Sequence, residues 1–304
     1  MRMLYPLQGL ATLSGLFGKT RQGWYQWASG LDETVLFDAL VAQMAIDIRS
    51  EMNNMKLGTS KLLLLINEQL DLQGLHVGRD RLYAILRERG LLIRRRRRRA
   101  VTTNSNHLFK RYPNLIKERV LNQPEEVWVS DITYLRLEKG FAYLSLITDA
   151  YSRKIMGYCL HPTLAAEGPQ KALMMAFTQR HYPDHKLIHH SDQGIQYCSY
   201  DYVQLLKSNG IAVSMTKGGS PQENAIAERI NGILKQEYEL HKTFGSIEQA
   251  QKAVAQGIAS YNEKRPHRSL EMQTPDQVHR KLSAEHILQV QSEDRNKEQS
   301  VKLQ

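Results

Sequence analysis

The stretch EVWVSDITYLRLEKGFAYLSLITDAYSRKIMGYCLHP, residues 126–162, decides the fold class. It contains three runs rich in β-branched and aromatic residues, separated by short turns, which is typical of an antiparallel meander. Helical and strand-like patterns then alternate over residues 170–180, 186–192, 200–209, 211–217 and 223–240. The order βββαβαβα predicts an α/β fold, a mixed five-stranded sheet flanked by helices.

The chain before this stretch has a different pattern, because its apolar residues recur at helical spacing. In residues 1–45 we expect a helix-turn-helix-like segment followed by the start of a long helix. This long helix is expected to span residues 33–54. A second helix-turn-helix-like subdomain is expected over residues 46–93. Beyond it, the sequence predicts a basic linker at 94–122, a larger α/β domain at 123–285 and a polar tail at 286–304.

Positive charge is concentrated in the first third of the chain. Residues 1–110 carry 17 Lys and Arg against 9 Asp and Glu, whereas residues 111–304 carry 24 against 22. Such a surplus is typical of proteins that bind polyanions, although a solvated basic surface has the same composition. The candidate phosphate contacts are Arg79, Arg81 and Arg87 on one expected helix and the linker run Arg94, Arg95, Arg96, Arg97, Arg98 and Arg99.

Neither a membrane span nor a secretory signal is expected. The sequence has no run of eighteen apolar residues, and its opening segment is interrupted by Pro6, Gly9 and Gly15. Its two cysteines, Cys159 and Cys198, cannot form a disulfide framework. These features predict a soluble cytoplasmic protein without a membrane partner.

Three carboxylates occupy positions that suit a metal site. Asp131 lies in the middle of an otherwise apolar strand face, where an unpaired charge would be costly. Asp192 ends an expected strand, at the edge where α/β sheets bind ligands. Glu228 lies on the polar side of an expected helix, close to Asn224, Asn231 and Lys235. Taken singly, a paired acid, a turn-forming Asp and a solvated helix face explain them equally well.

The spacing of the three acids favours a joint role. Sixty residues separate Asp131 from Asp192, and 35 separate Asp192 from Glu228. Their local sequences are VWVSDITY, HHSDQGIQY and SMTKGGSPQENAIAERINGILKQE, followed by YNEKRPHRSLEMQTPDQV. Across essentially the whole chain this sequence resembles the second-frame transposase of the insertion sequence three family of bacterial mobile elements, which carries an integrase-like core with a D, D, 35, E motif.

This resemblance implies an RNase H-like catalytic core in which Asp131, Asp192 and Glu228 are the catalytic residues. The implied chemistry is in-line phosphodiester transfer assisted by two Mg²⁺ ions about 4 Å apart, with Mn²⁺ as a substitute. Asp131 is expected to bridge both ions, while Asp192 and Glu228 each hold one. Water would free a 3′ hydroxyl at the element's end, and that hydroxyl would attack a second DNA phosphate.

The implied partner is double-stranded DNA, namely the terminal inverted repeats and the target. Joining two ends implies a homo-oligomer on DNA, and the family implies fusion with, or binding to, the upstream-frame product and association with the bacterial nucleoid. Further DNA contacts are expected at Asn224, Asn231, Lys235, Lys264, Arg265 and Arg268. Two alternatives stay open: a metal-dependent nuclease that does not join strands, and a catalytically silent DNA-binding protein from a decayed element.

Overall fold

The computed structural model describes residues 20–93, 110–117, 119–217 and 224–281, without the side chains of residue 21 and residues 23–32. The chain divides into two compact units, a helical unit and a sheet-containing unit. The short segment Met52–Lys56 belongs to the sheet-containing unit, although it lies between two helices of the other. The polar tail expected at 286–304 and the basic linker through residue 109 lie outside the described residues.

The helical unit contains α2 (Arg21–Glu51), α3 (Thr59–Leu70), the 3-10 turn η1 (Asp71–Gln73) and α4 (Arg79–Glu88). Its fully buried side chains recur at helical spacing, as in Leu62 and Ile66 of α3 and Leu82 and Ile85 of α4. The boundary expected between residues 45 and 46 falls inside α2, because no Pro or Gly interrupts residues 31–51. Residues 20–45, the described part of the first expected subdomain, therefore share one compact unit with the second, and residues 1–19 lie outside the described residues.

The sheet of the second unit follows the predicted meander. Strands β1 (Val127–Leu137), β2 (Gly140–Asp149) and β3 (Ile155–His161) pair antiparallel, and β4 (Ile188–Ser191) and β5 (Ala212–Met215) extend the sheet in parallel with β1. The spatial order is β3-β2-β1-β4-β5. A sixth strand, β6 (Thr243–Phe244), pairs with the end of β1, so the predicted count of five is one too low.

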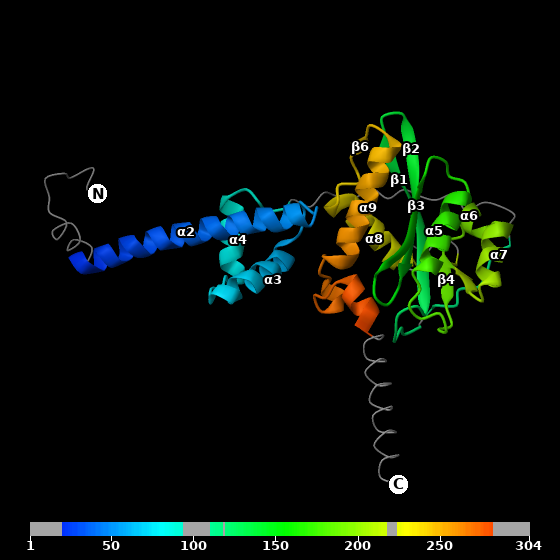
Figure 1. Cartoon of the computed structure of the whole chain (residues 1–304), viewed down its shortest axis with the longest axis horizontal. Coiled ribbons are helices and arrows are strands. Elements are labelled where there is room, and N and C mark those ends of the chain that lie inside the picture. Colours follow the sequence, from blue (N-terminus) through cyan, green and yellow to red (C-terminus); the bar gives the residue numbers. More distant parts are fainter. Residues whose placement is uncertain (1–19, 94–109, 118, 218–223, 282–304) are drawn as a thin grey trace, which may run out of the picture. The chain divides into compact units, whose positions relative to one another are not determined.

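Helices cover both faces of this sheet, as Figure 1 shows. Helices α5 (Glu167–Thr178), α6 (Ile195–Cys198) and α7 (Tyr200–Ser208) enclose a core with Trp128 and Ile147. Helices α8 (Ala225–Glu237) and α9 (Ile247–Glu263) enclose a second core with Leu135 and Leu144. The two sets of strand residues alternate in sequence, which places them on opposite faces. This is an RNase H-like fold.

The remaining described elements are short. A 3-10 turn, η3 (Arg268–Leu270), follows α9, and residues 275–281 are helical. Both cysteines carry free thiols. None of the helices in the described ranges is long and apolar enough to cross a membrane.

Replacing Gly157 by Ala is expected to destabilise the sheet unit. A Cβ at this position of β3 would stand 2.0 Å from the carbonyl oxygen of Ala172 and 2.7 Å from the amide nitrogen of Ala176, both in the backbone of α5. Backbone atoms cannot rotate away, so we expect a loss of about 1–3 kcal/mol, the usual range for overpacking. Thermal unfolding followed by circular dichroism measures it. Gly58→Ala is the control, since nothing lies within 4 Å of that Cβ, and equal effects of both changes would contradict the prediction.

Candidate active site

Strand pairing brings Asp131 and Asp192 together. β1 and β4 run parallel with Val129 opposite His190. Continuing this register by two residues sets Asp192, directly after β4, beside Asp131 on the neighbouring strand. Adjacent strands lie about 4.8 Å apart, so the two carboxylates are side by side on neighbouring strands. The Oδ1 atom of Asp192 accepts a hydrogen bond from the amide of Gly194 at 2.9 Å, which turns the chain into α6.

Helix α8 contributes Glu228 to the same region. Asn231, one turn further along α8, donates from Nδ2 to Oδ2 of Asp131 at 2.7 Å. Residues three apart on a helix share a face. The exposed Glu228 and the buried Asn231 therefore project toward the same part of β1. Glu228 also lies in the first turn of α8, where the helix dipole favours a negative charge.

Electrostatic repulsion among the three acids indicates that they lie in one region. The pKa of Asp131 is raised to about 7, because burial disfavours its charge and because Asp192 and, more weakly, Glu228 repel it. The hydrogen bonds from Asn231 and from the amide of Ile132 act in the opposite direction without cancelling this effect. The site therefore concentrates negative charge that the protein leaves only partly compensated.

A divalent cation fits this donor set. Carboxylate oxygens are the ligands that Mg²⁺ prefers, and a cation would relieve the repulsion at Asp131. The three acids are nevertheless spread more widely than the ligands of a single ion. Among the residues that the structure describes, one group of three His, Cys, Asp or Glu residues has ligand atoms all within 4.8 Å of one another, and it consists of Glu125, His181 and His279.

Buried polar contacts hold β1 and β4, the strands next to the acids, in place. His189 is fully buried, with Nε2 lying 2.6 Å from Ser130 Oγ and 2.9 Å from Tyr202 Oη. Burial, assisted by His190, lowers its pKa to about 3, so the ring is neutral. His190 Nδ1 lies 2.8 Å from Ser214 Oγ, which joins β4 to β5. Both histidines therefore position β4 rather than contact a substrate.

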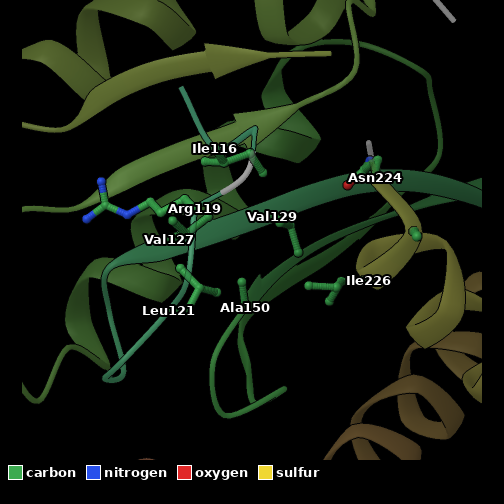
Figure 2. Close-up of a pocket in the computed structure, with 9 residues that line it drawn as sticks. Ile116, Arg119, Leu121, Val127, Val129, Ala150, Asn224 and Ile226 are labelled. Atoms are coloured by element: carbon green, nitrogen blue, oxygen red, sulfur yellow. The ribbon is translucent and has the colours of Figure 1, made fainter. Parts of the chain in front are cut away.

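Two nearby side chains were not selected from the sequence. Tyr197 on α6 is buried, and its pKa is raised by burial first and then by Tyr202, Asp131 and Asp192. Arg119 is exposed and lines a pocket whose floor includes Val127 and Val129, the strand residues that precede Asp131 on its face. Figure 2 shows this pocket between β1 and the start of α8. Neither residue belongs to a periodic pattern, so only the fold reveals it.

The expected DNA contacts divide into exposed and buried groups. Arg79, Arg87, Lys264 and Arg268 are exposed and stay predictions. Arg81 is exposed but forms a bidentate pair with Asp38, at 2.9 and 2.6 Å, which neutralises much of its charge. Arg94 to Arg99 lie outside the described residues.

Two of the expected contacts on α8 and its N-cap are buried. Asn224 is buried and donates from Nδ2 to the carbonyl of Ser130 at 3.1 Å, and the buried Asn231 donates to Asp131. Their amides are used to hold β1, because α8 packs against this strand. Lys235 is half-buried, with Nζ 4.4 Å from the centre of the Tyr134 ring. Its role in binding DNA stays a prediction.

Arg265 needs the clearest correction. It is 3% exposed, and its Nε and Nη2 atoms bond to Oε2 and Oε1 of Glu237 at 2.8 and 2.6 Å. A guanidinium held in this way in the interior cannot reach a DNA phosphate. The basic sequence around Pro266 contains an internal ion pair between α8 and the end of α9, with Lys264 and Arg268 exposed beside it.

Comparisons with known proteins agree with this architecture. Residues 122–221 and 209–275 each match the family described as integrase core domain. The "Insertion element IS600 uncharacterized 31 kDa protein" of Shigella sonnei is 33% identical over 257 residues, which cover 84% of this chain and 93% of that protein. A "Putative transposase for insertion sequence element IS986/IS6110" of Mycobacterium tuberculosis is 33% identical over 214 residues, 68% of this chain and 76% of that protein.

Among solved structures, the catalytic core domain of HTLV-2 integrase in complex with magnesium matches with a TM-score of 0.42 and 17% identity, covering 52% of this chain and 97% of that one. The two family matches define the protein as one with an integrase catalytic core. The chain belongs to the insertion sequence three family of transposases.

Replacing Asn231 by Ala is expected to weaken divalent-metal binding about 10–100-fold, the usual cost of removing a group that orients a metal ligand. The change removes the 2.7 Å hydrogen bond that fixes the Asp131 carboxylate. Isothermal titration with Mg²⁺ or Mn²⁺ measures it. Gln236→Ala, at an exposed position of the same helix, serves as the control. An unchanged affinity in Asn231→Ala would show that this amide does not orient a ligand.

Proposed function

We propose that this chain binds the terminal inverted repeats of an insertion sequence and catalyses Mg²⁺-dependent cleavage and strand transfer of their ends. The observation that carries the proposal is the meeting of Asp131, Asp192 and Glu228, from a central strand, a strand end and a helix, in a family of transposases. Asp131 is repelled by both other acids and is poorly compensated by the protein, which suits a carboxylate that shares cations.

The three acids would hold the Mg²⁺ ions, and Mn²⁺ can replace them because it accepts the same oxygen ligands. When bound, the ions supply positive charge to the attacking and leaving oxygens of an in-line displacement. Asn231 orients the carboxylate of Asp131 from α8. Gly194 fixes Asp192 at the end of β4 through its amide. The protein thus holds the acids in fixed positions for cleavage and for strand transfer.

In the first step a water oxygen attacks the phosphorus at the element's end, and the 3′ oxygen leaves as a hydroxyl. In the second step this hydroxyl attacks a target phosphate, and another 3′ oxygen leaves. Each step exchanges one P–O bond for another, so no covalent enzyme intermediate or oxidant is needed. Exposed Arg79, Arg87, Lys264 and Arg268 would contact phosphates and hold the DNA without reading its sequence.

Joining two ends at one target site requires two ends at once, so the active form would be a homo-oligomer on DNA. We also propose that the product of an upstream reading frame takes part, as a fusion or a bound partner, and that the complex acts at the bacterial nucleoid. Gel filtration and crosslinking in the presence and absence of terminal DNA test the first of these statements.

The deciding experiment incubates the protein with Mg²⁺ and labelled DNA carrying the element's flanking inverted repeat, alone and with the upstream-frame product. The expected products are nicks at the repeat end and molecules longer than the substrate. Nicks without joined molecules would indicate a nuclease. Retarded DNA without either product, under both conditions, would indicate a DNA-binding protein that has lost catalysis.

A further inference from the structure

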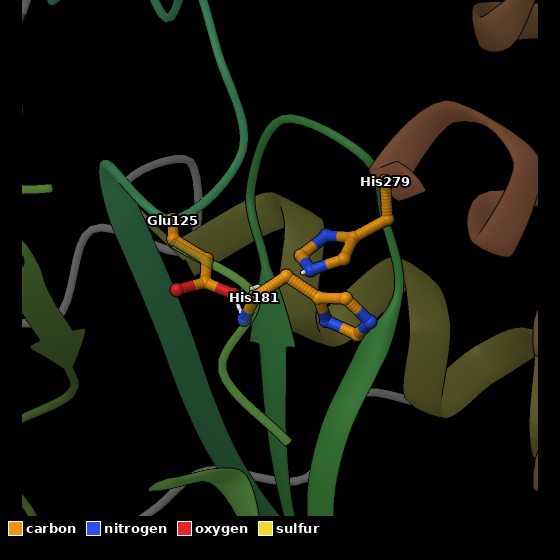
Figure 3. Close-up of side chains that lie close together, drawn as sticks. All are labelled: Glu125, His181 and His279. Atoms are coloured by element: carbon orange, nitrogen blue, oxygen red, sulfur yellow. Dashed lines mark hydrogen bonds and ion pairs between the residues drawn. The ribbon is translucent and has the colours of Figure 1, made fainter. Parts of the chain in front are cut away.

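A second group of potential metal ligands lies at the beginning of the sheet, away from the three acids. Glu125 precedes β1, His181 follows α5, and His279 belongs to the helical segment 275–281. One ligand atom from each lies within 4.8 Å of the others. Figure 3 shows the three side chains close together. Glu125 is six residues before Asp131, about 20 Å along an extended chain. The two groups are therefore separate sites.

Both histidines hold the tautomer that a metal ion requires. Ser152 donates its single hydroxyl hydrogen to Asp149 at 2.7 Å, so its oxygen accepts from Nδ1 of His279, which lies 2.9 Å away. Nδ1 of His181 lies 3.0 Å from the carbonyl oxygen of Gln179, which can only accept. Both Nδ1 atoms therefore carry hydrogen. Nε2 is left as the lone-pair nitrogen of each neutral ring. An oxygen that accepts the hydrogen of the other ring nitrogen typically orients metal-bound histidines.

The gap between His279 and Glu125 has the size of a metal site. Both side chains are fully buried, and Nε2 of His279 lies 3.3 Å from Oε1 of Glu125 without a hydrogen bond of acceptable geometry. A charged N–H···O bond would be shorter, about 2.7–2.9 Å. Two ligands bound to Zn²⁺ at about 2.0–2.1 Å with tetrahedral geometry are about 3.3–3.4 Å apart.

Glu125 retains the capacity to bind an ion. Its Oε2 accepts from Arg180 Nε at 2.9 Å and from the amide of Tyr182 at 3.3 Å, whereas Oε1 accepts from the amide of His181 at 2.7 Å. A carboxylate oxygen has two lone pairs, so Oε1 has one directed elsewhere.

The charges around the group are balanced before any ion binds. Arg180 faces Glu125, and Lys154 lies 2.8 Å from Asp276. Asp149, buried beside Ser152, is the remaining acid. Arg280 also pairs with Asp276, at 2.9 Å. The three acids named here are therefore matched by three basic groups, and the fixed charges are balanced without a cation. The exposed ring of His181 gives solvent access to Nε2 of His279.

We propose that Glu125, His181 and His279 bind one Zn²⁺ ion, with water completing its coordination, and that this ion fastens segment 275–281 to the start of the sheet. The donor set of two imidazoles and one carboxylate matches zinc better than magnesium. The rival occupant of the gap is a proton. Burial lowers the pKa of His279, but the facing carboxylates of Asp149 and Glu125 outweigh it and raise the pKa.

The test uses full-length protein without a histidine tag, carrying Asp131→Asn and kept in excess Mg²⁺, so that zinc at the three acids does not contribute. Zinc content after dialysis and the visible absorption of the Co²⁺-substituted protein are measured. We expect one equivalent of zinc and a melting temperature about 5–10 °C higher at a hundredfold excess over Kd. Activity is not part of the readout, so failure of this test leaves the proposed function unaffected.

The matched variants are His181→Asn, which removes an exposed ligand without disturbing the core, and His185→Asn, four residues further along the same loop. We expect zinc affinity to fall at least about 100-fold in the first and to be unchanged in the second. Retention of zinc by His181→Asn would overturn the three-residue site. The proposal would also be overturned if the wild-type protein binds no zinc and nitrogen-15 NMR shows both ring nitrogens of His279 protonated at neutral pH. A proton would then occupy the gap.

Discussion

Asp131→Asn is expected to reduce both cleavage and strand transfer by about 10³-fold or more, with the fold intact. The change keeps the size of the side chain and removes the charge that would be shared between cations. Losing several kcal/mol of transition-state stabilisation corresponds to a rate loss of this order. Asp192→Asn and Glu228→Gln should have effects of the same order, because each removes one carboxylate from the same group. Product formation on terminal-repeat DNA measures all three.

The control for this series is Asp201→Asn, an exposed carboxylate in the first turn of α7. It removes the same charge from the same unit without touching the three acids, so activity should be unchanged. Binding of terminal DNA, measured by gel shift, should persist in every variant, since phosphate contacts belong to other residues. Full activity of Asp131→Asn would exclude the proposed catalytic role of this acid.

The sequence indicated where the three candidate acids lie in the fold, because each prediction depended on local pattern. Strand alternation placed Asp131 on the face that meets α8, and the strand end placed Asp192 on the neighbouring strand. The helical period placed Glu228 and Asn231 on one face. Each of these rules acts over a few residues, so the fold preserved them.

The expected DNA contacts failed where long-range partners decide. Arg265 has the local setting of a surface residue, but Glu237, 28 residues earlier, neutralises it in the interior. Asn224 is used on Ser130, 94 residues away. The cluster of Glu125, His181 and His279 left no signal either, since its members are joined only by the packing of three separate segments. The type of a residue determines which ligands its side chain can bind, whereas tertiary contacts decide whether that side chain can reach a ligand.

The stability of the metal-free protein should depend on Asp131 in a direction opposite to that of most acids. The pKa of this carboxyl is about 7 in the fold, against its ordinary value of 3.8. Below about pH 3 the carboxyl is protonated in both folded and unfolded states, and its contribution is neutral. As the pH rises toward 7 the unfolded chain releases the proton first, so folding becomes less favourable. The cost reaches roughly 4 kcal/mol above pH 7, at 1.36 kcal/mol per pKa unit.

Asp131→Asn isolates this contribution, because the amide mimics the protonated acid at every pH. In EDTA the variant should match wild type near about pH 3 and become progressively more stable than wild type up to pH 8, by an amount on the order of 4 kcal/mol. Glu125, whose pKa is lowered to about 2, destabilises both proteins equally in acid and cancels in the difference. Urea unfolding at a series of pH values measures the difference. Saturating Mg²⁺ should shrink or reverse it, because the ion favours the charged form. Parallel curves for the two proteins in EDTA would mean that Asp131 ionises normally, and the repulsion inferred among the three acids would then be absent.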